Sequence, residues 1–228
     1  MTMEPEEWEI YLQPTEFIDS DSEIVQSFAE NATVSASTPT EKAIRLYYAV
    51  RDDIRYDPYR IDLTRQGLKA SKILGRGYGY CVAKAVVLAA AARAQRIPSR
   101  LGFANVRNHL TTERLRQLMQ TDEFIFHGYT ELFLDQHWLK ATPTFNLDLC
   151  RRFGVKPLHF DGKNDALLHA YDAKGNRHME YTFDHGHFSD VPYEQILTSF
   201  RKHYPFYFQQ DGFKAGDFER EAQEENKA

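Results

Sequence analysis

The chain has 228 residues, 42% of them hydrophobic, and is therefore long enough to bury the core of one domain with a small appended part. Its formal net charge of −5 provides no electrostatic attraction to nucleic acid or to an anionic membrane, and we expect neither as a partner. An acidic N-terminus and the absence of a long apolar run predict a cytoplasmic protein without a signal peptide or a membrane span.

Two helices are predicted in the first quarter of the chain. The first should begin near residues 19–22. The second is better marked, because Thr38 and Glu41 match a capping box and Pro39 suits the first helical position. Apolar residues then recur at helical spacing as far as Ile54, which indicates a helix with one buried face.

A glycine-punctuated loop, residues 75–80, delivers Cys81 to the start of an alanine-rich helix that should run to Ala94. A cysteine at a helix start meets free backbone N–H groups and the positive end of the helix dipole, and both favour the thiolate. Cys81 is therefore a candidate nucleophile, although small buried cysteines also occur at such positions as packing residues. Cys150 is the second of two cysteines, and we expect no disulfide between them.

The segment after this helix predicts a strand at residues 99–106 and a short amphipathic helix at residues 112–120. Strict alternation follows from Phe124 to Asp135 and indicates a long strand with one apolar face and one chemically varied face. His127 lies on the varied face.

A tight turn at residues 135–136 is expected to return the chain through a second strand that includes Trp138. If those two residues form the whole loop, Thr142 opposes Tyr129. Thr142 is then a diagonal neighbour of His127 on the same face of the hairpin.

The C-terminal part is predicted to contain further antiparallel strands, one more helix and a disordered tail. The expected elements are strands at residues 166–171 and 177–183, turns at 172–175 and 184–186, a helix from Asp190 toward Arg201, and the tail from Gly216. We divide the chain into an N-terminal segment (1–35), a core (36–146), a strand and helix extension of the same domain (147–213) and a polar tail (214–228).

Motifs for cofactors and metals are incomplete. The glycines at 75, 77 and 79 lack the third glycine of a dinucleotide fingerprint and the Gly-Lys-Ser/Thr of a phosphate-binding loop. His185 and His187 lack the cysteine or carboxylate spacing that would complete a metal site. We therefore expect no cofactor and no metal.

Two stretches in the correct order resemble the transglutaminase-like superfamily, a papain-related group. Gly79–Ala85, followed by Ile97–Arg100, resembles the cysteine-helix motif of that family. In the second half of the family motif, a histidine is followed by glutamate at plus four and tryptophan at plus eleven, and His127, Glu131 and Trp138 match.

The resemblance implies an α+β fold, in which the cysteine helix packs on an antiparallel sheet around the His127 hairpin and a β-rich C-terminal extension follows. It also implies a cysteine–histidine–aspartate triad that acts through a thioester acyl-enzyme, with Cys81 as nucleophile and His127 as general base and then acid. Glu131 and Trp138 are expected to shape the hairpin rather than to react.

Thr142 occupies the position of the family aspartate, at plus fifteen from His127. A threonine hydroxyl can orient an imidazole but carries no charge to stabilise an imidazolium. Three hypotheses follow: Thr142 serves as the orienting residue, a carboxylate from elsewhere such as Asp148 or Asp161 replaces it, or the enzyme has lapsed.

The sequence thus favours a cysteine enzyme that acts on an amide, as in a peptide or protein, or on a thioester. It would be an acyltransferase or a hydrolase such as a cysteine peptidase or amidase. The alternative is a catalytically weakened fold that binds a peptide or protein. The sequence leaves the substrate and the oligomeric state open.

Overall fold

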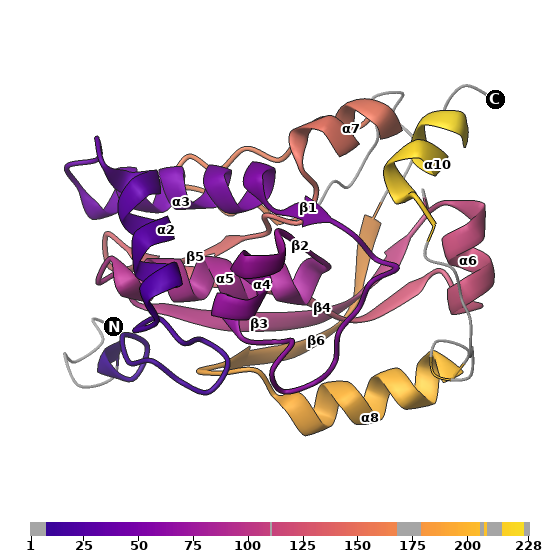
Figure 1. The fold of residues 1–228 in the computed structure, drawn as a ribbon, viewed down its shortest axis with the longest axis horizontal. Coiled ribbons are helices and arrows are strands. Elements are labelled where there is room, and N and C mark those ends of the chain that lie inside the picture. The colour runs from indigo at the N-terminus through magenta and orange to yellow at the C-terminus, as the bar shows by residue number, and fades with distance from the viewer. Residues whose placement is uncertain (1–7, 110, 168–178, 206–207, 209–215, 226–228) are drawn as a thin grey trace.

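The fold is built on a four-stranded antiparallel sheet with the strand order β5-β4-β3-β6 (Figure 1). Its strands are β3 (Ser99–Asn108), β4 (Glu123–Leu134), β5 (His137–Ala141) and β6 (Met179–Phe188). The computed structural model describes residues 8–109, 111–167, 179–205, 208 and 216–225. Helices pack against this sheet, and the predicted α+β fold is confirmed.

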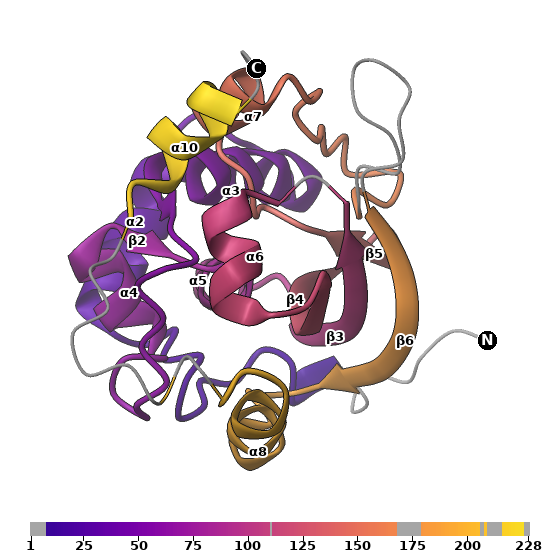
Figure 2. The same cartoon turned by 90° about the vertical axis from the view of Figure 1, so that its right-hand side faces the viewer.

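Helix α5 (Cys81–Ala94) is the helix expected after the glycine-rich loop, and it lies at the centre of the molecule. Figure 2 shows it enclosed by the sheet on one side and by α2 (Glu23–Thr33), α3 (Pro39–Asp53) and α4 (Ala70–Arg76) on the others. Every residue from Cys81 to Arg93 is buried. A helix that is apolar on all sides is stable only inside a core, and its alanines allow neighbouring elements to approach closely.

Two charged side chains are buried in α5, and backbone carbonyls satisfy both. Lys84 Nζ donates to the carbonyl oxygens of Arg51 and Ile54 at 2.8 and 2.7 Å, at the end of α3. Arg93 donates to three backbone carbonyls, those of Gln13, Ser99 and Ser189. These bonds fix the neighbouring chain segments to the central helix.

The start of α3 follows the sequence prediction, whereas α4 and a parallel pair of short strands were not predicted, and α4 takes Gly75 out of the expected loop. Thr38 and Glu41 form the capping box at the start of α3, with Pro39 as its first residue. After α3, strand β1 (Arg55–Tyr56) pairs in parallel with β2 (Tyr78–Gly79). Since Gly79 is only two residues before Cys81, this pairing fixes the chain that leads into the cysteine.

The predicted hairpin is confirmed. Leu134 pairs with His137, so the loop between β4 and β5 consists of Asp135 and Gln136, with φ values of 48° and 68°. Positive φ at both loop residues matches the right-handed twist of the strands. Regular pairing ends at Thr130 and Ala141, just before Thr142.

A bulge in β4 corrects the predicted strict alternation. The register between β3 and β4 shifts between Ala104 and Val106, and Phe126 adopts a φ of 56°. The Phe126 N–H donates to the side-chain oxygen of Asn105 at 3.2 Å. This bond satisfies a backbone N–H that the bulge leaves unpaired in the strand ladder. The bulge lies directly before His127.

The C-terminal part differs from the prediction in two places. The turn expected at residues 184–186 is absent, because β6 continues through it, with register shifts that accommodate Gly186 at a φ of 80°. Residues 218–225, for which we expected disorder, form helix α10 (Phe218–Glu225), whose Phe218 is buried against Tyr56 and Tyr59. A polar composition did not reveal this single aromatic anchor.

The remaining described helices are α6 (Glu113–Met119), α7 (Leu147–Phe153) and α8 (Tyr193–His203), of which α6 and α8 were expected. The predicted turn at 172–175 and most of the strand at 166–171 fall outside the described residues. None of the helices in the described ranges has the length and apolar character needed to cross a membrane.

Candidate active site

Cys81 is the first residue of α5, and 7% of its surface is exposed. Burial raises the pKa of its thiol to about 11, while the backbone N–H groups of Gly128, Val82 and Cys81 itself favour the thiolate and oppose this rise. The helix start therefore acts as expected, but burial has the larger effect. The resting group is a neutral thiol surrounded by donors that can stabilise negative charge.

Gly128 brings strand β4 into direct contact with the first turn of α5. A Cβ at this position would lie 2.9 Å from Cα and 3.2 Å from Cγ2 of Val82, closer than an ordinary contact. Glycine is required here because any side chain would separate the strand from the helix. The same close approach places the residue after His127 against the Cys81 thiol.

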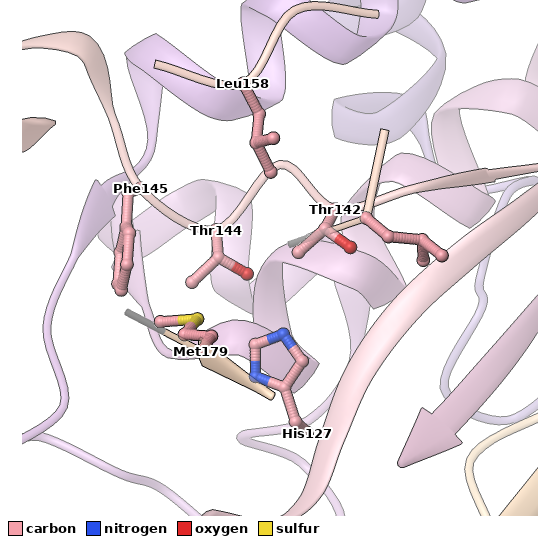
Figure 3. Close-up of a pocket in the computed structure, with 7 residues that line it drawn as sticks. His127, Thr142, Thr144, Phe145, Leu158 and Met179 are labelled. Atoms are coloured by element: carbon pink, nitrogen blue, oxygen red, sulfur yellow. The ribbon is translucent and has the colours of Figure 1, made fainter. Parts of the chain in front are cut away.

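His127 is 5% exposed, and its Nε2 has no hydrogen-bond partner among the described residues. Burial lowers the pKa of the imidazole to about 4, so His127 is neutral at physiological pH and able to accept a proton. Figure 3 shows its ring pointing toward Thr142 and Thr144.

These two threonines share a small cavity of about 10 Å³ with His127. The Oγ1 atoms of Thr142 and Thr144 are buried and, like His127 Nε2, have no hydrogen-bond partner in the part of the chain that the structure describes. The rest of the lining is apolar and consists of Phe145, Leu158, Leu167 and Met179. Three unpartnered polar atoms around one small space form a site with the partners that a bound water requires.

The sequence predicted Thr142 but not Thr144. The backbone of Thr142 leaves the hairpin, since its N–H donates to Ala166 O at 2.8 Å and its carbonyl accepts from Tyr47 Oη at 3.3 Å. The chain continues in an extended form beyond Ala141, so Thr144, two residues after Thr142, lines the same cavity. Their spacing of two was the available signal for Thr144.

Neither proposed substitute carboxylate reaches His127. Asp148 is exposed and pairs with Arg151 at 3.1 Å, while Asp161 accepts hydrogen bonds from Lys163 and Asn164 in its own turn. In the part of the chain that the structure describes, the cavity beside His127 has no acidic lining residue.

The structure therefore brings His127 and Thr142 together in one cavity and places Cys81 on a second one. Gly128 of β4 contacts the first turn of α5. Among the described residues, no hydrogen bond links the Cys81 thiol to the His127 ring. Both groups are neutral at rest. With the pKa of the thiol raised and that of the imidazole lowered by burial, the two groups hold no preformed ion pair.

Glu131 and Trp138 support the hairpin, as expected. The Arg100 guanidinium donates to the Glu131 carboxylate from the neighbouring strand and lies 4.1 Å from the Trp138 ring centroid. The three side chains join β3, β4 and β5.

No grouping of histidine, cysteine and carboxylate side chains that could bind a metal is present in the described ranges. His185 Nε2 lies 2.7 Å from Asn105 Oδ1, and its ring stacks on Phe126 with centroids 3.9 Å apart. These contacts assign His185 to the support of the β4 bulge. Cys81 and Cys150 are both free.

Comparison with known proteins gives one family match and several distant structural ones. The model of the transglutaminase-like superfamily matches residues 26–143. No curated protein sequence matches the chain. A candidate cysteine protease from Cytophaga hutchinsonii shares 17% identity at a TM-score of 0.46, over 77% of this chain and 53% of that one.

Red sea bream transglutaminase shares 17% identity at a TM-score of 0.40, over 63% of this chain and 31% of its own. The chain thus spans about half or less of these structures, and likenesses at this level carry no argument about activity.

Proposed function

Because the chain belongs to the transglutaminase-like superfamily, we propose that it is a cysteine enzyme that transfers or hydrolyses the acyl group of an amide or thioester. The observation that carries the proposal is the contact of Gly128 with the first turn of α5. The contact brings the Gly128 N–H to the Cys81 thiol, where it favours the thiolate. The residue before Gly128 is His127, a neutral base.

In the proposed reaction, Cys81 Sγ attacks the carbonyl carbon while its proton passes to His127. The backbone N–H groups around the thiol, including that of Val82, are the candidate donors to the developing oxyanion. The C–N or C–S bond of the substrate then breaks, and the proton on His127 goes to the leaving amine or thiol. A thioester on Cys81 remains.

Water or an amine then attacks this thioester, and His127 takes the proton of the new nucleophile. The C–S bond to Cys81 breaks, the acid or the new amide leaves, and His127 returns its proton to Cys81. Transfer and hydrolysis differ only in this second nucleophile.

Thr142 and Thr144 are proposed to orient His127 through a water in their shared cavity. Both hydroxyls lie on the side to which the His127 ring points, and within the described ranges neither has a hydrogen-bond partner. An uncharged partner holds the ring orientation but stabilises the imidazolium less than a carboxylate would. The proposed enzyme therefore depends on His127 as a base rather than on a resting ion pair.

A second candidate function is a binding module that has lost catalysis. The high pKa of Cys81 and the uncharged lining around His127 favour it. Such a module would retain a peptide ligand when Cys81 is replaced by alanine.

Alkylation with iodoacetamide at neutral pH, followed by mass spectrometry, distinguishes the two functions. The enzyme predicts selective modification of Cys81, with Cys150 as a buried internal control, and a lower rate in His127→Ala. His187→Ala is the matched control, since His187 is exposed on β6. A Cys81 as inert as Cys150 in the folded protein would exclude the enzyme.

A further inference from the structure

Strand β3 lies between β4 and β6, and both neighbours carry an extra residue at the same point along it. On β4, residues 125 and 126 together face Asn105, where the register between the strands shifts. On β6, His185 is the extra residue, where the register shifts beside Ala104. The two bulges therefore meet at residues 104–105 of β3.

The side-chain oxygen of Asn105 contacts both bulges. It accepts the Phe126 N–H at 3.2 Å, and it lies 2.7 Å from Nε2 of His185. The His185 ring in turn stacks on the ring of Phe126. A side-chain amide oxygen can accept from the backbone N–H and from a protonated Nε2 at once, so one residue of β3 joins the two irregular strands.

The second N–H of the β4 bulge also bonds to a distant side chain. Ile125 N–H donates to the Tyr204 hydroxyl at 2.6 Å, and this hydroxyl donates to Glu123 O at 2.9 Å. A bulge takes backbone groups out of the ladder, and a buried N–H without an acceptor costs about as much free energy as a lost hydrogen bond. Asn105 and Tyr204 therefore stabilise the bulge by supplying its acceptors.

The bulge determines which cavity His127 enters. In a regular strand, residues two apart lie on the same face. Ile125, however, lines the cavity at Cys81, whereas His127 lines the cavity that it shares with Thr142 and Thr144 (Figure 3). The extra residue between them separates the two side chains. Because no described group holds His127 Nε2, the place of the ring depends on the backbone that carries it.

We propose that Asn105 is a positioning residue, which stabilises the bulge and thereby directs His127 into the cavity of Thr142 and Thr144. The inference rests on the proposed function, because the place of His127 affects the reaction rate only if His127 acts as a base. Asn105 should therefore influence the chemistry of Cys81 only through His127.

A double-mutant cycle with His127 tests this dependence. Asn105→Ala removes the acceptor of the Phe126 N–H. We expect alkylation of Cys81 by iodoacetamide at neutral pH to become about tenfold slower, as for a displacement of the base by about half an ångström. In the His127→Ala background, the same substitution should leave the rate unchanged, because the base whose place it alters is gone.

A conservative variant and a matched control complete the test. Asn105→Asp keeps an acceptor oxygen at the same position and should restore most of the rate. Arg107→Ala is the control, since Arg107 also lies on β3 and pairs with Glu180 of β6 at 3.3 Å, outside residues 125–127. It should leave the rate unchanged. Urea unfolding verifies the fold of each variant, and Asn105→Ser, whose side chain is one atom shorter, takes the place of Asn105→Ala if that variant does not fold.

Three results would overturn the positioning role while the proposed function stands. They are a wild-type rate in folded Asn105→Ala or Asn105→Ser, an equal slowing in the His127→Ala background, and an Asn105→Asp variant as slow as Asn105→Ala. If instead His127→Ala labels Cys81 at the wild-type rate, or if Cys81 is as inert as Cys150, the proposed function fails and the positioning role fails with it.

Discussion

Replacing Gly128 with alanine tests how closely strand and helix must approach to form the site. The new Cβ would lie 2.9 Å from the backbone Cα of Val82, whereas ordinary contacts begin at 3.4 Å. The nearest atom is backbone in a buried helix turn, so it cannot rotate away, and strand or helix must move by about half an ångström. We predict that Gly128→Ala destabilises the protein by about 1–3 kcal/mol.

The same movement should slow the chemistry. It displaces the Gly128 N–H from the Cys81 thiol and shifts His127, the preceding residue. Because a misplacement of about 1 Å can lower a catalysed rate by about 100-fold, a shift of half that size predicts alkylation of Cys81 about tenfold slower.

Urea unfolding followed by tryptophan fluorescence measures the stability, and iodoacetamide labelling with mass spectrometry measures the rate. Gly75→Ala is the control, because Gly75 lies in α4 with its nearest neighbour 4.0 Å away. It should stabilise the protein by about 0.5–1 kcal/mol. If Gly128→Ala unfolds at the wild-type urea concentration and labels at the wild-type rate, the close approach is not what builds the site.

Three further predictions concern buried ionisable side chains, and urea unfolding measures the stability in each case. Burial lowers the pKa of His127 from 6.5 to about 4, so the unfolded chain binds this proton first and stability falls as pH drops from 6.5 toward 4. His127→Gln should therefore lose about 2 kcal/mol less stability than wild type between pH 7 and pH 4.5, and equal losses would refute the burial of a neutral ring. Burial lowers the pKa of Lys84 to about 7, so the unfolded chain binds this proton more tightly and stability rises with pH. The free energy of unfolding of wild type should increase by about 2 kcal/mol relative to Lys84→Met as pH rises from 7 to 9, and a pH-independent difference would contradict this. Arg93→Lys should destabilise the protein by about 2–4 kcal/mol, because an ammonium group cannot match the guanidinium fork that reaches three backbone carbonyls. The control Arg151→Lys, at an exposed position, should change the free energy of unfolding little. Equal effects of the two substitutions would exclude a special role for the fork.

Local signals were sufficient wherever neighbouring residues determine the backbone. The capping box of Thr38 and Glu41 and the alanine-rich run after Cys81 predicted their helices. The alternation on either side of residues 135–136 predicted the hairpin and its two-residue loop.

The bulge at Phe126 could not be predicted in this way. An aromatic residue gives no local indication of a positive φ, and the groups that satisfy the bulged backbone come from distant positions. Asn105 accepts from Phe126 N–H, and Tyr204 accepts from Ile125 N–H. Such compensation depends on the folded arrangement of the chain.

The candidate site shows the same division. Its main residues, Cys81, His127 and Thr142, could be named from the resemblance of their motifs to the family, and their roles stay predictions. The balance between helix start and burial at Cys81 could not be weighed, since the depth of the thiol depends on the walls that surround it. Tyr204 is one of those walls and has no motif of its own.

Strand β6 has a consequence for how this fold tolerates shortening. It pairs along β3 from Leu101 to Asn108, although it lies outside the segment that matches the family. A fragment that ends at residue 143 would leave β3 as a long edge strand with unpaired backbone groups, and such edges recruit strands from other molecules. Strand β6 therefore protects the edge of β3, and a chain truncated at residue 143 should self-associate rather than remain monomeric.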